Sequence, residues 1–463
     1  MAAQAHQDGL PVPQRYWSVA AIWLAILMAV LDGAIANVAL PTIGHQLQAA
    51  PAESIWVVNA YQLAITVSLL PLAALGDIVG YRRVYLAGLV LFTLASAGCA
   101  MSHTLHELTI ARVVQGVGGA GIMAINGALV RFTFPSRMLG RGIGLNAVVV
   151  SLSAALGPSV AAAILGVASW PWLFAVNVPL GIITILIGWR SLPVTPRAKR
   201  RFDWISGLLN ALTFGLLIYG AESTARNAGG TGVYALAGGV VAGVLLIRRE
   251  LTMAAPLVPL DLMRIPVFRL SVLTSILSFA AQMLAFVALP FFFQTIMHRS
   301  VVETGLLMTP WPLAVAISAP IAGRLADRLP VGILGAGGLA AFAIGLALLA
   351  LIPAGADNAE VVWRMVVCGL GFGFFQSPNN RAMISAAPRH RSGAAGGMLA
   401  TARLLGQTAG ATSMAILFHL LNDGATHTGL AIASGLAACA ALVSSLRGAS
   451  RSEPVSPEAA EIG

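Results

Sequence analysis

The stretch LTIARVVQGVGGAGI, Leu108–Ile122, is an apolar run that contains one arginine and four glycines. A charged side chain at the centre of a membrane helix costs about 2.5–3.5 kcal/mol on insertion scales, and an arginine cannot shed its charge. We therefore expect Arg112 to face a bundle interior, a water-filled cavity or an anion; the alternative is a side chain that reaches the outer interface. Gln115, one turn later, extends the polar stripe inward and favours the first interpretation. Gly116 and Gly119 are predicted packing positions, because small residues let a second helix approach closely.

The composition indicates an integral membrane protein. The 463 residues are 58% hydrophobic and 10% charged, with a mean hydropathy of +0.85. The one lysine, Lys199, stands between Ala198 and Arg200, so the chain lacks the Gly-Lys-Ser/Thr of a P-loop. Transport would therefore run on a partner protein or an ion gradient, and we predict no cofactor. The three cysteines lie far apart without metal-ligand spacing, so we predict no metal site. An enzyme is not expected, since the embedded residues supply no set of nucleophile, base and orienting group.

Fourteen apolar runs are long enough to cross a membrane. They lie at 17–40, 54–75, 84–102, 108–130, 143–164, 172–189, 204–220, 232–247, 270–296, 303–322, 331–352, 362–384, 394–418 and 429–446. If the chain begins in the cytoplasm, 22 of the 27 basic residues fall in cytoplasmic loops or tails. This asymmetry predicts a multi-pass protein of the bacterial cytoplasmic (inner) membrane with both termini inside. The net charge of +10 is then a topology signal that contacts membrane lipids, and nucleic acid is not an expected partner.

An internal repeat divides the chain. Pro71–Asp77 recurs loosely as Pro320–Asp327, and the pattern from Arg112 to Gly118 recurs as Arg364–Gly371, both at offsets of about 250 residues. We predict an all-α fold of two six-helix halves and an inserted helix pair outside the transport core, with the substrate site between the halves near the midplane. The predicted boundaries are a cytoplasmic tail at 1–16, the first half at 17–190, a basic linker at 191–203, the inserted pair at 204–247, a second cytoplasmic linker at 248–269, the second half at 270–446 and a cytoplasmic tail at 447–463.

Asp32 is the only carboxylate well inside a predicted span, at a depth close to that of Arg112. Burial and a neighbouring arginine act on the protonation of a carboxyl group in opposite directions, so such a group can switch when its access to water changes. We predict that Asp32 and Arg112 couple transport to protons. The alternative is a static ion pair, but a buried pair is a poor stabiliser compared with apolar packing.

Other embedded polar and aromatic residues are candidates for a cavity wall. In the first half they are Asn37, Asn59, Tyr61, Gln62, Gln115 and Asn126, and in the second half Gln282, Phe286, Trp311, Gln376, Asn379, Arg403 and Gln407. Each one alone could equally be a helix-helix contact. Gly157 and Pro158 predict a bend in the fifth span. Charged residues at the cytoplasmic helix ends predict a gate that latches the halves: Asp77, Gly80, Arg82, Arg83, Asp327 and Arg328.

Several motifs together resemble the major facilitator superfamily, in its fourteen-span drug:proton antiporter branch. They are LDGAIANVALP (31–41), ALGDIVGYRR (74–83), LTIARVVQGVGGAG (108–121), ALGPSVAA (155–162), WPWLFAVNVPLG (170–181) and SGAAGGMLATARLLGQTAG (392–410). The resemblance implies export of small molecules in exchange for protons, with proton coupling at Asp32, a proton-relay or charge-balancing role for Arg112, and a cytoplasmic gate at Asp77 and Arg82. We expect a monomer; a periplasmic partner stays open.

Two other readings of function remain open. One is a dedicated exporter or importer of a single metabolite, and the other is a channel or a membrane scaffold. Because Arg112, Arg364 and Arg403 stand against the single acid Asp32, we expect neutral, zwitterionic or anionic amphiphiles rather than divalent cations.

Overall fold

The computed structural model describes residues 9–135, 138–195, 197, 202–225, 230–253, 261–326, 328–387, 392–421 and 424–449, and every regular element in these ranges is a helix. The first half contains α1 (Gln14–Gln46), α2 (Pro51–Ser54), α3 (Trp56–Val79), α4 (Tyr81–Ala100), α5 (Leu105–Thr133), α6 (Leu139–Leu165), α7 (Trp172–Ala175) and α8 (Asn177–Ser191). The inserted pair is α9 (Trp204–Ala225) and α10 (Thr231–Glu250). The second half contains η2 (Leu262–Arg264), α11 (Pro266–Phe291), the π-helix η3 (Phe292–Ile296), α12 (Val301–Met308), α13 (Pro310–Leu325), α14 (Val331–Ala350), α15 (Asn358–Ala386), α16 (Ser392–Leu421) and α17 (Ala425–Ala449).

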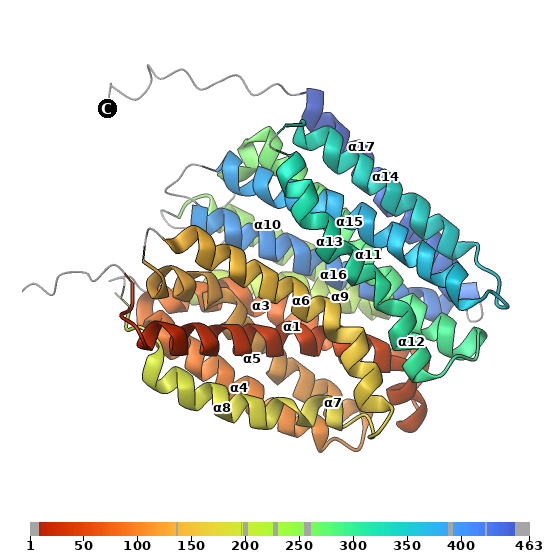
Figure 1. Ribbon diagram of the computed structural model, residues 1–463, viewed down its shortest axis with the longest axis horizontal. Helices are drawn as coiled ribbons and strands as arrows, with labels where there is room; N and C mark the ends of the chain where they lie inside the picture. The colour runs from red at the N-terminus through yellow and green to blue at the C-terminus, as the bar shows by residue number, and fades with distance from the viewer. Residues whose placement is uncertain are drawn as a thin grey trace, which may run out of the picture.

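The all-helical membrane fold predicted from the sequence is confirmed. Thirteen stretches of described helix are long and apolar enough to cross a membrane. The remaining predicted span corresponds to α6, of which the shorter stretch Leu156–Leu165 is apolar. Figure 1 shows that α1 begins and α17 ends on the same side of the bundle, as an even number of crossings requires. The count of fourteen stays a prediction.

Helix packing builds two halves that meet along a few helices. In the first half α1 packs on α6 and α8, and α5 packs on α3 and α4. In the second half α11 packs on α16 and α17, while α15 packs on α13 and α14 (Figure 1). Between the halves, α3 contacts α16, α6 contacts α12, and α1 contacts α11. The two halves therefore meet along α1, α3 and α6 on one side and α11, α12 and α16 on the other.

The loose sequence repeat corresponds to a repeated packing contact. A Cβ atom added to Gly118 of α5 would lie 2.5 Å from the backbone nitrogen of Phe92 on α4. A Cβ atom added to Gly371 of α15 would meet the backbone nitrogen of Phe342 on α14 in the same way. Phe92 and Phe342 are 250 positions apart, as the offset in the sequence predicts. The glycines therefore hold the corresponding helix pairs of both halves at van der Waals distance.

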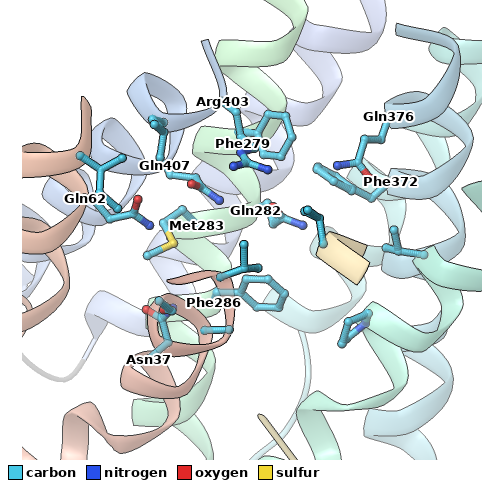
Figure 2. Close-up of a pocket in the computed structure, with 18 of the residues that line it drawn as sticks. Asn37, Gln62, Phe279, Gln282, Met283, Phe286, Phe372, Gln376, Arg403 and Gln407 are labelled. Carbon is cyan, nitrogen blue, oxygen red and sulfur yellow. The ribbon is translucent and has the colours of Figure 1, made fainter. Parts of the chain in front are cut away.

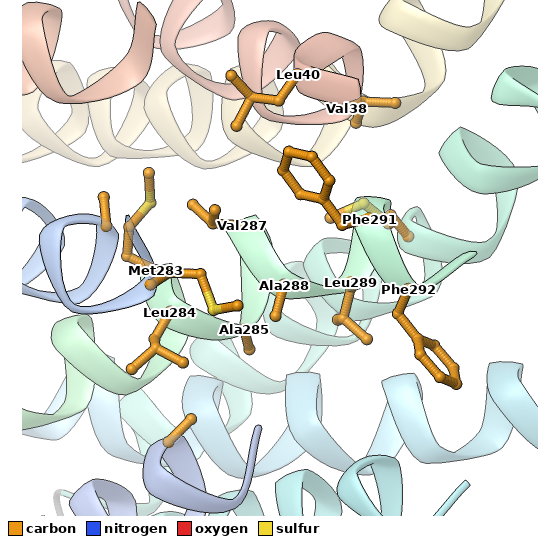
Figure 3. Close-up of a cluster of buried hydrophobic side chains, with 14 of the residues drawn as sticks. Val38, Leu40, Met283, Leu284, Ala285, Val287, Ala288, Leu289, Phe291 and Phe292 are labelled. Carbon is orange, nitrogen blue, oxygen red and sulfur yellow. The ribbon is translucent and has the colours of Figure 1, made fainter. Parts of the chain in front are cut away.

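The two halves are joined at one end of the bundle, which is the outer end if the chain begins in the cytoplasm. There the side-chain nitrogen of Gln294 donates to the carbonyl oxygen of Val38 at 3.1 Å, and the hydroxyls of Ser159 and Thr309 lie 2.7 Å apart. An apolar cluster surrounds these contacts, and Figure 3 shows Phe291 of α11 beneath Val38 and Leu40 of α1. These contacts close the predicted outer end.

The two helices α9 and α10 pack together at the flank of the bundle. Helix α9 packs on α3 and α16, and α10 packs on α9. Asp203 caps α9, because its carboxylate accepts hydrogen bonds from the backbone nitrogens of Ile205 and Ser206. The same carboxylate accepts two hydrogen bonds from the Arg249 guanidinium of α10, at 2.9 and 3.2 Å. Partial burial raises the pKa of Asp203, but the bonds from Arg249 and Ser206 outweigh it and lower that pKa from 3.8 to about 2.

Because the folded-state pKa of Asp203 is depressed, its stabilising effect is complete above about pH 4 and is lost as the pH falls toward 2. The substitution Asp203→Asn is expected to lower the free energy of unfolding by about 1 kcal/mol at pH 6, in the range of partly exposed ion pairs. Thermal unfolding of the two purified proteins would measure this. At pH 2.5 the difference between the two melting temperatures should be clearly smaller than at pH 6, because folding no longer gains the full effect of the lowered pKa. A difference of equal size at both pH values would contradict the assignment.

Candidate functional site

An ion pair between α1 and α5 is the most deeply buried charged feature of the described residues. Arg112 is fully buried, Asp32 is 2% exposed, and a guanidinium nitrogen of Arg112 contacts a carboxylate oxygen of Asp32. The depth of Arg112 follows from the start of α5, where the Thr104 hydroxyl accepts from the backbone nitrogen of Glu107 and the Glu107 carboxylate accepts in return from Thr104. Arg112 lies about two turns beyond this cap. The two charges therefore meet in the interior of the first half and away from lipid.

Further polar groups complete the network. The side-chain nitrogens of Gln115 and Asn177 donate to the second carboxylate oxygen of Asp32 at 2.9 and 2.8 Å. The Gln115 oxygen accepts from Arg112 at 2.6 Å, and Arg112 Nε donates to the carbonyl oxygen of Val57 at 2.8 Å. One guanidinium nitrogen, Arg112 Nη2, is buried and has no hydrogen-bond partner. Both oxygens of the Asp32 carboxylate therefore accept hydrogen bonds, whereas one donor nitrogen of Arg112 is left without a partner.

Tyr61 of α3 separates this ion pair from the centre of the molecule. The Arg112 guanidinium carbon lies 4.0 Å from the centre of the Tyr61 ring, and the Tyr61 hydroxyl donates to the carbonyl oxygen of Ala29 at 2.9 Å. A Cβ atom added to Gly116 would lie 2.6 Å from the Tyr61 carbonyl oxygen, and one added to Gly119 would lie 3.0 Å from the Tyr61 hydroxyl. The small residues of α5 therefore make room for the tyrosine. Its other side faces a pocket.

A central pocket of about 170 Å³ lies between the halves, and Figure 2 shows side chains from both pointing into it. Nine of the residues predicted for the cavity wall line it: Asn37, Tyr61, Gln62, Gln282, Phe286, Trp311, Gln376, Arg403 and Gln407. Ala29 and Gly33 also line it, one turn before and one residue after Asp32. The ion pair therefore lies one layer of residues behind the pocket wall. Among the lining residues there is no aspartate or glutamate.

The other four predicted cavity residues do not line this pocket, which corrects the prediction for them. Gln115 lies one turn from Arg112 on the same helix face and belongs to the ion-pair network. Asn379 donates to the Ser275 hydroxyl at 2.8 Å and contacts Arg447 of α17, near one end of the second half. Asn59 is fully buried and Asn126 nearly so, each with a side-chain oxygen that has no hydrogen-bond partner.

The predicted bend residues bring α6 close to both halves. A Cβ atom added to Gly157 would collide with the Ala34 side chain on α1, and Ala34 lines the pocket. The carbonyl oxygen of Pro158 would lie 2.6 Å from a Cβ atom on Gly305 of α12. Helix α6 therefore contacts α1 of its own half and α12 of the other half through the adjacent residues Gly157 and Pro158.

Two of the predicted gate residues, Asp77 and Arg82, make contacts within the first half. The Tyr81 hydroxyl donates to Asp77 at 2.5 Å, and Arg82 donates to the carbonyl oxygen of Trp189 at the end of α8. Gly80 separates α3 from α4 with a φ of +104°, a conformation that favours glycine. Arg82 thus ties α4 to α8 in this structure, and the latch between the halves stays a prediction.

The other predicted gate arginines, Arg83 and Arg328, lie at the surface in this structure. Arg83 is exposed, and with Gly80 and Arg82 it lines a surface groove of about 800 Å³ between α4 and α8. Arg328 is exposed, and Asp327 lies outside the described residues.

The sequence interpretation missed two partners of the ion pair. Asn177 stands in the motif at 170–181 without a predicted role, and Ser96, whose hydroxyl accepts from Gln115 at 2.9 Å, is not among the predicted residues. The sequence could have predicted a buried role for Asn177, because it is a lone amide at the start of an apolar helix. A serine in a membrane helix carries no such signal, since its hydroxyl commonly bonds the backbone one turn earlier, as Ser96 also does.

Comparisons with known proteins agree with this architecture. A family model described as Major Facilitator Superfamily matches residues 22–411. The "Uncharacterized transporter YebQ" of Escherichia coli (strain K12) is 55% identical over 443 residues, which cover 95% of this chain and 97% of that protein. The "Riboflavin transporter RibZ" of Clostridioides difficile (strain 630) is 32% identical and is matched over 85% of this chain and 86% of its own length. The "Multidrug resistance protein Stp" of Mycobacterium tuberculosis (strain ATCC 25618 / H37Rv) is 30% identical, over 84% and 73%.

The fold is also similar to solved structures. A crystal structure of a POT family transporter in complex with a thioalcohol conjugated peptide superimposes with a TM-score of 0.71 at 16% identity, covering 92% of this chain and 94% of that chain. At this identity the likeness concerns the fold alone.

Proposed function

Because this chain belongs to the major facilitator superfamily, we propose that it is a proton-coupled secondary transporter of the fourteen-span drug:proton antiporter branch. It exports amphipathic small molecules by alternating access. The observation that carries the proposal is the Asp32–Arg112 ion pair, which lies buried one residue layer behind a pocket between the halves. An intramembrane carboxylate next to a substrate site is suited to carry protons.

In the proposed cycle, Asp32 takes up a proton when the pocket is open to the acidic outside. Protonation removes the charge that holds Arg112 and thereby favours the form that is open to the cytoplasm. Substrate that enters the pocket from the cytoplasm or the inner leaflet then favours release of the proton to the cytoplasm. Gly33 and Tyr61 line the pocket beside the pair, and the proton would pass between the pocket and Asp32 at these residues. Each cycle moves one proton in and one substrate molecule out.

A dedicated metabolite transporter is the second candidate. The pocket volume of about 170 Å³ is small beside the several hundred Å³ of typical ligand pockets, which favours a compact ligand. The relatives are consistent with both candidates, since one is named for riboflavin and another for multidrug resistance.

Transport by purified protein in liposomes tests the proposal. With the lumen at pH 5.5 and the outside at pH 7.5, a panel of amphipathic compounds is expected to accumulate inside, and the lumen should become more alkaline as they enter. Protein-free liposomes and a proton ionophore are the controls. Accumulation that survives collapse of the pH gradient would reject proton coupling. Accumulation of a single metabolite from a broad panel would favour the second candidate.

A further inference from the structure

We propose that the central pocket contains an anion subsite centred on Arg403, and that the transported substrate is a compact, planar aromatic acid with one carboxylate. The claim that this acid is transported, and in which direction, rests on the proposed function. The binding site itself follows from the charges and shape of the pocket.

Arg403 of α16 lines the pocket without a counter-ion. Its Nε is buried and has no hydrogen-bond partner, and no ion pair joins it to a carboxylate of the described residues. Arg112 and Arg364, which also lie inside predicted spans, behave differently, since Arg112 pairs with Asp32 and Arg364 pairs with Glu360 at 3.2 Å. An arginine keeps its charge at every physiological pH, and an unpaired charge in a membrane interior is unfavourable. A bound anion would supply the missing partner.

Neutral hydrogen-bond donors surround the same position. Gln282 of α11, Gln376 of α15 and Gln407 of α16 direct their amide groups into the space beside Arg403, as Figure 2 shows. None of these amides hydrogen-bonds another described residue. An amide nitrogen and a guanidinium together can serve both oxygens of a carboxylate. The pocket thus offers several donors and one fixed positive charge to a ligand.

Aromatic side chains form the rest of the wall. The rings of Phe286 and Trp311 lie 4.9 Å apart, and those of Phe279 and Phe372 lie 5.2 Å apart, centre to centre. All four residues line the pocket. These rings pack on one another and together give the pocket an aromatic wall, on which a flat apolar body can stack or lie edge to face. A pocket of about 170 Å³ has room for one compact ring system beside the charged group.

The geometry also argues against cationic substrates. Asp32, which lies one residue layer behind the pocket wall, accepts hydrogen bonds from Arg112, Gln115 and Asn177. A cation in the pocket would face Arg403 with no carboxylate among the described lining residues to offset the repulsion.

Binding of matched probes to the purified full-length protein tests the inference. 1-Naphthoate carries the predicted charge, and 1-naphthamide has the same ring system without it. A hydrogen-bonded charge pair corresponds to about 10- to 100-fold in affinity, so the wild-type protein should bind the acid more tightly by that factor. The substitution Arg403→Gln should remove this preference while changing the affinity for the amide by less than about 3-fold. Calorimetric titration in detergent measures all four affinities.

The matched control is Arg364→Gln, which removes an arginine outside the pocket and should leave the preference for the acid intact. Equal binding of both probes by the wild-type protein, no binding of the acid, or an equal loss of both probes in Arg403→Gln would each overturn the inference. Because these titrations use no gradient, a failure of proton-driven export would reject the proposed function and leave this result standing.

Discussion

Replacing Asp32 by asparagine is expected to abolish proton-driven accumulation of substrate. Asparagine preserves the shape of the side chain and can still accept hydrogen bonds from Gln115 and Asn177, but it cannot take up or release a proton. With a difference of two pH units, one proton per substrate can sustain an accumulation of about 100-fold. The Asp32→Asn protein is expected to reach only equal concentrations on both sides, as measured by uptake into liposomes.

A second assay separates lost coupling from lost folding. The Asp32→Asn protein should still exchange labelled for unlabelled substrate without a gradient, because the pocket itself is unchanged. Asp203→Asn removes an acid that lies outside the pocket and should accumulate substrate like the wild type. Normal accumulation by the Asp32→Asn protein would reject the coupling scheme.

A side chain at Gly118 is expected to prevent normal folding. In Gly118→Val the new Cβ atom would lie 2.5 Å from the backbone nitrogen of Phe92 and 2.8 Å from the carbonyl oxygen of Gly88. Neither contact can be relieved by a rotamer change, because both partners are backbone atoms. Overpacking of this kind costs about 1–3 kcal/mol or more, a large share of the marginal stability of a folded protein. The yield of monodisperse protein in size-exclusion chromatography should fall several-fold.

Gly127 on the same helix provides the control. A Cβ atom added there meets no heavy atom within 4 Å. Gly127→Ala should therefore leave the yield unchanged or raise it, since alanine favours a helix by roughly 0.5–1 kcal/mol over glycine. Equal yields of the Gly118 and Gly127 variants would show that the contact between α4 and α5 is not as close as described.

The sequence predicts which residues are functional candidates wherever a polar or charged residue interrupts an apolar run. Asp32 and Arg112 stand out because charged residues are rare in membrane helices, and Gln115 follows at helical spacing on the same face. Gln62 and Arg403 were found in the pocket wall for the same reason. Polarity alone predicts that such a residue faces protein, and it does not identify the group that it contacts.

The predictions that failed depend on partners from distant parts of the chain. Asn379 has the polarity of a cavity residue, but Arg447 from the last helix contacts it. The hydrogen bond from Arg82 to the carbonyl oxygen of Trp189 has a similar origin, because Trp189 lies more than a hundred residues further along the chain. Backbone carbonyl groups occur at every position, so no sequence pattern marks the one that will be used.

The unpaired guanidinium of Arg403 has a consequence for the electrical work of the cycle. If a monovalent anion leaves while one proton enters, each turnover moves the equivalent of two positive charges into the cell. At a voltage of 100 mV this adds about 4.6 kcal/mol, since each charge contributes roughly 2.3 kcal/mol. The exchange would then be electrogenic and would continue in cells whose interior and surroundings have the same pH. Exchange of a monovalent cation for a proton would be electroneutral and would stop under those conditions.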